Sequence, residues 1–197
     1  MNRYVCIRAK ALEGLGNAVV HTLESGLILV DSEVPLDKKG LVCVNDNPWF
    51  TDENLPLVKV KKAVLEGTDG VGKTSTIEGL IKQGIVCGDR EPYICQYMLF
   101  NVDMGTRCKA YEEYFRTGGN AVIFLVNNSK EELERRVYGR GRVSEFDRET
   151  YAYNLLYKET FGEMQKYQTY GKLKMVDCTG LTIEEQIEKV KQCLMLT

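Results

Sequence analysis

The sequence predicts an α/β protein: a three-layer core around a shortened parallel sheet, preceded by a small β-rich module. From residue 63 onward, apolar strand-like runs alternate with helical stretches, as in parallel sheets covered by helices. A glycine-rich run joins the first such strand to the first helix, and residues 1–61 lack the alternation. We therefore expect an N-terminal module (residues 1–61) and a core domain (residues 62–197).

The N-terminal module contains short apolar segments separated by turn-forming residues, a pattern that favours strands. The segments cover residues 4–7, 27–30 and 41–44. Residues 46–57, which contain two prolines, are expected to form a loop or linker. We expect the module mainly to supply packing, an edge strand or a dimer contact, with substrate recognition as the alternative. Trp49, Phe50 and the single histidine, His21, are more often structural than functional in such settings.

The core domain is predicted to contain four strands with helices between them. The strands cover residues 63–66, 84–87, 121–126 and 173–177, and the helices cover residues 75–83, 129–136 and 182–194. Ser129 is expected to cap its helix, whose first turn carries two glutamates. The last helix has apolar residues at near-helical spacing, so one of its faces should pack against the sheet.

The run GTDGVGKT, residues 67–74, fits the phosphate-binding pattern GxxxxGK[ST] and lies between a predicted strand and a predicted helix. Its glycines allow backbone N–H groups to turn inward around a polyphosphate at a helix N-terminus, which favours anions. Lys73 would reach the β- and γ-phosphates of ATP, and the Thr74 hydroxyl would ligate Mg²⁺. We call residues 67–74 the phosphate loop. The predicted ATP-binding residues are Gly67, Thr68, Asp69, Gly70, Val71, Gly72, Lys73, Thr74 and Ser75.

An acidic and a basic residue follow the second apolar strand. Asp89 lies where an enzyme with this loop would place a carboxylate that holds Mg²⁺, directly or through water, or accepts a proton from the attacking hydroxyl. Arg90 would face an anionic acceptor, because guanidinium pairs with phosphate through two hydrogen bonds. A surface ion pair is the competing interpretation for these two residues.

Four arginines lie within eight residues, and two glycines interrupt the helix between them. They are Arg135, Arg136, Arg140 and Arg142, with Gly139 and Gly141. This pattern is typical of a mobile cationic segment that closes over a triphosphate and neutralises the charge of the transferred phosphoryl group. Arg140 and Arg142, flanked by glycine, are the predicted catalytic residues, together with Lys73 and Asp89. For Arg135 a solvated helix face is the simpler interpretation.

The stretches LEGTDGVGKTST, VIFLVNNSKEELERR and FDRETYAYNLLYKETF, with the Asp-Arg pair and the arginine-rich segment, resemble the thymidylate kinase branch of the P-loop nucleoside monophosphate kinases. The resemblance covers about residues 62–195. It implies a P-loop kinase core, a homodimer, and ATP- and Mg²⁺-dependent phosphoryl transfer to dTMP, dUMP or a 5-substituted analogue. It also implies that Asp69 contacts the acceptor 3′-hydroxyl, that Asp89 and Arg90 are the family's Asp-Arg pair, and that Arg136 binds substrate.

The acceptor side departs from the family pattern. The family has a further strand and helix before the Asp-Arg strand, with a Thr-Arg-Glu-Pro-Gly-Gly segment that binds the acceptor, whereas here Gly84 follows the first helix almost at once. The donor half therefore looks complete and the acceptor half shortened or rebuilt. We hypothesise that the N-terminal module compensates, which requires residues 1–61 to lie near Asp69 and Arg90.

Composition limits the partners. The formal net charge of -2 gives no overall basic field that would attract DNA or a membrane surface, and no apolar run approaches the roughly 20 residues that span a bilayer. The seven scattered cysteines form no CxxC pair, which favours reduced thiols in the cytoplasm. Two alternatives stay open: a kinase acting on a hydroxyl of a modified base or terminus in DNA, and a nucleotide-dependent switch. A GTPase would need an Asn-Lys-x-Asp segment, which residues 127–130 do not supply.

Overall fold

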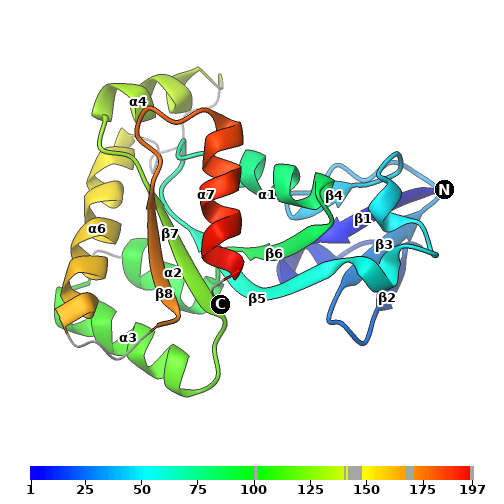
Figure 1. Cartoon of the computed structure of the whole chain (residues 1–197), viewed down its shortest axis with the longest axis horizontal. Coiled ribbons are helices and arrows are strands. Elements are labelled where there is room, and N and C mark those ends of the chain that lie inside the picture. Colours follow the sequence, from blue (N-terminus) through cyan, green and yellow to red (C-terminus); the bar gives the residue numbers. More distant parts are fainter. Residues whose placement is uncertain (100–101, 140, 142–147, 167–170, 196–197) are drawn as a thin grey trace.

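The computed structural model describes residues 1–99, 102–139, 141, 148–166 and 171–195. These residues form a mixed α/β fold with two four-stranded sheets, one antiparallel and one parallel, and six α-helices. The antiparallel sheet lies at one end of the molecule, beside the parallel sheet (Figure 1). Within the ranges given, no helix combines the length and the apolar character required to cross a membrane.

The antiparallel sheet has the strand order β2-β3-β1-β4. Its strands are β1 (Asn2–Cys6), β2 (Val19–Thr22), β3 (Ile28–Ser32) and β4 (Leu41–Cys43). The sequence predicts β1, β3 and β4 but not β2, whose four residues are all exposed and therefore lack the alternation of a half-buried strand. Three short 3₁₀ helices belong to the same part of the chain: η1 (Ala9–Leu12), η2 (Pro48–Phe50) and η3 (Leu55–Leu57).

The parallel sheet has the strand order β6-β5-β7-β8. Its strands are β5 (Lys59–Glu66), β6 (Ile85–Asp89), β7 (Ala121–Val126) and β8 (Leu173–Asp177). The predicted ranges of β7 and β8 are confirmed. β5 begins four residues earlier than predicted, because Lys59 already pairs with Ile85 of β6. The phosphate loop therefore follows a central strand, and Asp89 ends the strand beside it.

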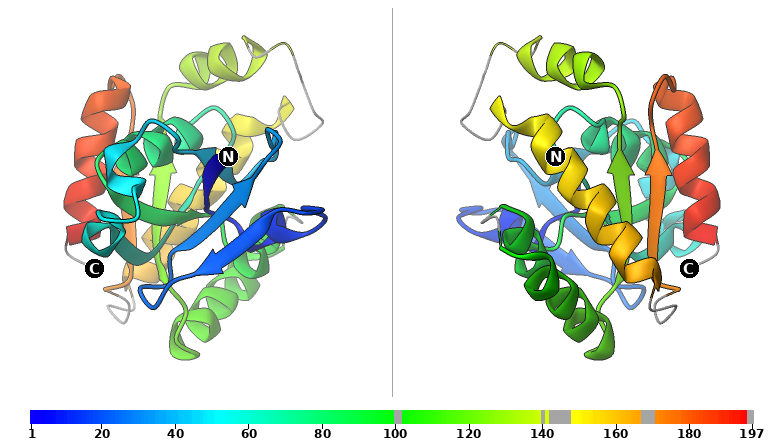
Figure 2. Two further views of the ribbon diagram at one scale, coloured as in Figure 1. Left: turned by 90° about the vertical axis from the view of Figure 1, so that its right-hand side faces the viewer. Right: turned by 90° about the vertical axis from the view of Figure 1, so that its left-hand side faces the viewer.

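Helices cover both faces of the parallel sheet, which confirms the predicted layering (Figure 2). They are α1 (Lys73–Lys82), α2 (Pro92–Leu99), α3 (Met104–Arg116), α4 (Lys130–Tyr138), α6 (Thr150–Lys166) and α7 (Ile183–Met195). Leu65 and Ile123 belong to the cluster that contains α1 and α7, whereas Val64 and Val122 belong to the cluster that contains α2, α3 and α6. This division follows from the two-residue period of a strand.

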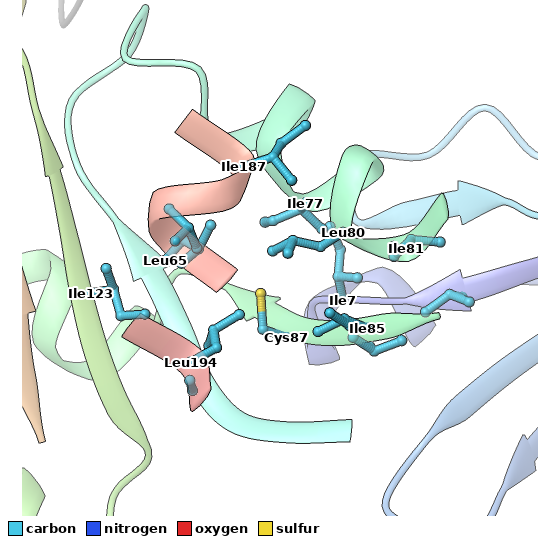
Figure 3. Close-up of a cluster of buried hydrophobic side chains, with 14 of the residues drawn as sticks. Ile7, Leu65, Ile77, Leu80, Ile81, Ile85, Cys87, Ile123, Ile187 and Leu194 are labelled. Atoms are coloured by element: carbon cyan, nitrogen blue, oxygen red, sulfur yellow. The ribbon is translucent and has the colours of Figure 1, made fainter. Parts of the chain in front are cut away.

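The two sheets share one hydrophobic cluster. Ile7, which follows β1, packs in the same cluster as Leu80 of α1 and Ile85 of β6 (Figure 3). Trp49 lies against Gly84, where a Cβ atom would meet the indole ring at 2.5 Å. Trp49 is thus a packing residue. The boundary near residue 61 stays a prediction, and the N-terminal module is packed onto the core.

Candidate functional site

The phosphate loop joins the C-terminal end of β5 to the N-terminus of α1. Gly67 has φ +148°, and a Cβ atom there would lie 2.4 Å from the carbonyl oxygen of Leu125 in β7. Gly72 has φ +94° and approaches Gln186 of α7, whose Nε2 would lie 3.0 Å from such a Cβ. Gln186 also donates a hydrogen bond to the Val71 carbonyl at 3.1 Å. The loop is therefore held in place by β7 and α7, and only glycine fits where it touches them.

Lys73 is the first residue of α1, and its side chain is only 7% exposed. Its Nζ donates hydrogen bonds to the carbonyl oxygens of Gly67 at 2.6 Å and Thr68 at 2.7 Å. Burial, together with the positive charge of Arg90, lowers the pKa of Lys73 to about 7. The nearby carboxylates therefore do not offset the effect of burial on the charged ammonium. A polyphosphate in the loop would add negative charge that favours the charged form.

Glu66, the last residue of β5, is a buried carboxylate that the sequence does not single out. Its Oε1 accepts a hydrogen bond from the Glu91 backbone N–H at 2.7 Å, and its Oε2 accepts one from the Tyr157 hydroxyl at 3.2 Å. Burial raises the pKa of Glu66 to about 6. The only sequence signal is an acid that ends an otherwise apolar run. Through these two hydrogen bonds, Glu66 connects β5 to the turn that follows β6 and to α6. Glu66 is also the residue immediately before the phosphate loop.

Arg90 turns back onto the phosphate loop from the end of β6. It has φ +59° and is the one non-glycine residue with positive φ within the described ranges. Such a left-handed conformation is strained for a long side chain. The guanidinium Nη2 donates to the Asp69 carboxylate at 2.9 Å and to the Gly67 carbonyl at 3.3 Å. The Arg90 side chain is 19% exposed and the Asp69 side chain 37%, so the arginine is the more buried partner of this pair.

Asp89 receives a partner from the N-terminal module. Its Oδ2 accepts a hydrogen bond from Arg8 Nε at 2.7 Å, and its backbone N–H donates to the Ile7 carbonyl at 3.0 Å. The second carboxylate oxygen, Oδ1, is buried and has no hydrogen-bond partner within the described part of the chain. Arg8 belongs to no motif, so the sequence does not reveal this pair. The N-terminal module therefore lies beside Asp89, but none of its residues lines the Arg90 cavity. The hypothesis that it compensates for the shortened acceptor side stays a prediction.

Two cavities adjoin the phosphate loop and share no lining residue. The Arg90 cavity measures about 240 Å³ and is lined by Gly67, Thr68, Asp69, Arg90, Met98, Tyr153 and Tyr157. The Arg136 cavity measures about 350 Å³ and is lined by Gly70, Gly72, Ser75, Arg136, Leu181, Ile183 and Gln186. The first combines aromatic walls with one carboxylate and one guanidinium. The second combines a guanidinium with two aliphatic side chains, a serine hydroxyl and a glutamine amide.

The helix α4 positions one arginine of the predicted cationic segment. Ser129 caps α4 as predicted, with its Oγ accepting a hydrogen bond from the Glu132 N–H at 3.1 Å. One turn later Arg136 forms an ion pair with Glu132 and lines the Arg136 cavity, apart from Asp69 and Arg90. Arg135 is exposed. The predicted catalytic residues Arg140 and Arg142 lie outside the described residues.

Two threonines connect the N-terminal end of α6 to the phosphate loop. Thr150 Oγ1 donates a hydrogen bond to the Asp69 carbonyl at 2.8 Å, and Thr68 Oγ1 donates to the Thr150 carbonyl at the same distance. Both threonines are buried, Thr68 at 5% and Thr150 at 1% exposed. This connection places Tyr153 and Tyr157, one and two turns further along α6, on the wall of the Arg90 cavity.

The polar groups next to the loop fit Mg²⁺. Thr74 and Ser75 are exposed on the first turn of α1, and the partnerless Oδ1 of Asp89 is a hard oxygen ligand. Within the described ranges, no group of three or more His, Cys, Asp or Glu residues gathers as a metal site. Mg²⁺ usually takes most of its ligands from water and substrate phosphates, so one hydroxyl and one carboxylate would be enough protein ligands.

His21 lies away from this site. It is exposed on β2, where its Nε2 lies 3.3 Å from Asp31 Oδ2, and it lines neither cavity. The candidate site therefore consists of the phosphate loop, the Asp89-Arg90 turn, α4 and α6, with Arg8 added from the N-terminal module. A scan against models of known protein families and a search of curated proteins both found no match to the chain.

Proposed function

We propose that the protein transfers the γ-phosphoryl group of ATP to a deoxynucleoside monophosphate of the thymidylate type: dTMP, dUMP or a 5-substituted analogue. One observation carries the proposal. Arg90 is held in a strained conformation that directs its guanidinium onto Asp69, on the wall of a cavity separate from the Arg136 cavity. A protein that only binds or hydrolyses ATP has no need for a second charged cavity next to the phosphate loop.

The donor would occupy the phosphate loop and the Arg136 cavity. Its β- and γ-phosphates would lie on the loop amides and Lys73. Burial lowers the pKa of Lys73 to about 7, and an anion beside it would favour the charged ammonium. Its base would contact Leu181 and Ile183. Thr74 and Asp89 Oδ1 would hold Mg²⁺, whose charge offsets that of the phosphates.

The acceptor would occupy the Arg90 cavity. Its monophosphate pairs with the Arg90 guanidinium, which offers two parallel donors to phosphate oxygens. Asp69 accepts a hydrogen bond from the sugar hydroxyl, and the base lies among Met98, Tyr153 and Tyr157. Both nucleotides then meet at the phosphate loop, because each cavity includes glycines of that loop.

The transfer forms a bond between an oxygen of the acceptor phosphate and the γ-phosphorus of ATP, and it breaks the bond between that phosphorus and the β,γ-bridging oxygen. ADP leaves with that oxygen, and the acceptor becomes a diphosphate. The residues act by positioning and by charge, since little covalent chemistry is required of the protein. Arg140 and Arg142 stay the predicted arginines that neutralise the transferred group.

A guanine-dependent switch finds no support at Asn127. Its Nδ2 donates to Glu132 Oε2 at 2.9 Å, and its Oδ1 accepts from the Ser129 N–H at 2.8 Å, so the side chain is occupied in holding the start of α4. The DNA alternative stays open and is decided by the experiment below.

The experiment is a radioactive transfer assay with [γ-³²P]ATP and Mg²⁺. The acceptors are dTMP, dUMP, 5-substituted dUMPs, the other deoxynucleoside monophosphates, nucleosides and short DNA, and Lys73→Ala is the blank. We expect labelled diphosphate from a thymidylate-type monophosphate. Label transferred only to DNA would move the assignment to the DNA alternative. Tight ATP binding with no transfer to any acceptor would favour the switch.

A further inference from the structure

Arg8 is held rigidly at the end of β1. The Ile7 N–H donates to the Gly40 carbonyl at 2.9 Å, and Gly40, with φ +98°, comes so close that a Cβ there would lie 2.9 Å from the Arg8 Cβ. Cys6 Sγ donates to the Arg8 carbonyl at 3.1 Å. These contacts fix the backbone from which the Arg8 side chain extends toward the core domain.

The side chain ends on Asp89. Nε donates to Asp89 Oδ2 at 2.7 Å, and Nη2 contacts the same oxygen. The carboxylate is 4% exposed and the arginine side chain 22%, so Arg8 compensates a charge that is otherwise removed from water. The hydrogen bond from the Asp89 N–H to the Ile7 carbonyl lies beside this pair. The backbones of the two residues' segments are therefore joined next to the ion pair.

The pairing leaves the two oxygens of Asp89 in different roles. Oδ2 is taken by Arg8, whereas the buried Oδ1 has no hydrogen-bond partner among the residues described. Asp89 pairs with Leu65 in the parallel sheet, and the phosphate loop begins two residues after Leu65. The Asp89 carboxylate therefore extends from the end of the strand next to the loop. Buried oxygens in proteins usually accept a hydrogen bond from the protein or from water, or bind an ion, so Oδ1 has the capacity to take such a partner.

We propose that Arg8 is a positioning residue of the phosphoryl-transfer site: by binding Oδ2 it fixes the Asp89 carboxylate so that Oδ1 faces the Mg²⁺ of the bound ATP through water. The N-terminal module thereby adds one residue to the site of the core domain. This inference rests on the proposed function. Partners that orient metal-binding carboxylates typically contribute about 10- to 100-fold to metal affinity or activity.

The test compares Arg8→Ala with Arg3→Ala. Arg3 is a matched control, because it belongs to the same module, its side chain is 26% exposed against 22% for Arg8, and it also forms an ion pair, with Asp31 at 2.9 Å. Steady-state kinetics with the acceptor identified above should give about a 10- to 100-fold lower kcat for Arg8→Ala, with the KM for ATP within about threefold of wild type. Arg3→Ala should keep the wild-type kcat while losing as much thermal stability.

Two further variants guard against misfolding. Arg8→Lys keeps the charge and should recover part of the kcat, and Arg8→Gln keeps length without charge and should behave as Arg8→Ala. Thermal melts show which variants are folded at the assay temperature. Equal kcat values for Arg8→Gln, Arg3→Ala and wild type would overturn the proposal and leave the kinase assignment intact.

A binding readout separates this inference from the proposed function. Calorimetric titration gives the ATP affinity with and without Mg²⁺ for each variant. The ratio of the two affinities should fall in Arg8→Ala and Arg8→Gln and stay at the wild-type value in Arg3→Ala. If wild-type protein transfers phosphoryl to no acceptor, the proposed function fails while this ratio still decides the role of Arg8. An unchanged ratio in the Arg8 variants would refute that role.

Discussion

The two halves of the candidate site are built in different ways. The proposed ATP half is one continuous stretch, residues 67–75, completed by the wall of the Arg136 cavity. The proposed acceptor half brings together Asp69 from the loop, Arg90 from the end of β6 and Tyr157 from α6. Asp89, next to Arg90 in the chain, pairs with Arg8 of the N-terminal module. The first half can be recognised in the sequence as a motif because its residues are consecutive. The residues of the second half come together only when the chain folds.

The two halves of the candidate site also differ in backbone conformation. In the phosphate loop, glycines occupy the left-handed positions, so the backbone adopts its path at little cost. At the acceptor side, an arginine adopts a left-handed conformation, and the surrounding contacts must hold it there. We infer that the acceptor half stores backbone strain in order to direct one guanidinium onto the loop.

The largest expected effect concerns the ATP half. Lys73→Ala should lower turnover by about 10³-fold, because it removes the charge closest to the transferred group. The control is Lys82→Ala, which removes an exposed lysine from the same helix and should leave turnover unchanged. Initial rates at saturating ATP and acceptor measure both. Turnover by Lys73→Ala close to the wild-type value would remove Lys73 from the mechanism.

The second prediction uses the pKa of Lys73. In the free protein burial lowers it to about 7, so at pH 8 most of the population is uncharged. A triphosphate in the loop favours the charged form, so binding must take up a proton, and ATP affinity must fall as the pH rises from 7 to 9. Calorimetry in buffers of different ionisation enthalpy measures the uptake. We expect nearly one proton for wild type and none for Lys73→Met; equal uptake in both would assign the proton elsewhere.

The smallest expected effect concerns the strain at Arg90. Arg90→Gly and Arg90→Ala both remove the guanidinium and should lose turnover equally. Glycine adopts φ +59° freely and alanine does not, so the glycine variant should be more stable by about 1 kcal/mol. Urea unfolding followed by circular dichroism measures this difference. Equal midpoints would show that the left-handed turn relaxes once the side chain is removed.

The sequence predicts those elements whose signals lie in consecutive residues. β7 is predicted from an apolar run that is buried throughout, and α4 from a serine cap followed by acids, because these signals are local. β2 is missed because its four residues are all exposed, and its pairing with β3 depends on the neighbouring strand. The α/β class could thus be predicted from the sequence, whereas phosphate binding by residues 67–74 stays a prediction.

The remaining site residues depend on contacts across long separations. Glu66 and Tyr157 are joined by a hydrogen bond across 91 positions, and Arg8 and Asp89 by an ion pair across 81. No local pattern marks either pair. Arg136 is the intermediate case: its arginine-rich setting is visible in the sequence, but only the fold assigns it to the cavity apart from Arg90.

The most direct test of the two-cavity account is the affinity of ATP and of dTMP, each measured separately by calorimetry, for wild type, Arg90→Ala and Arg136→Ala. The account predicts opposite losses: Arg90→Ala weakens dTMP binding and keeps ATP binding, whereas Arg136→Ala weakens ATP binding and keeps dTMP binding. dTMP affinity unaffected by Arg90→Ala, or equal weakening of both nucleotides in both variants, would contradict it.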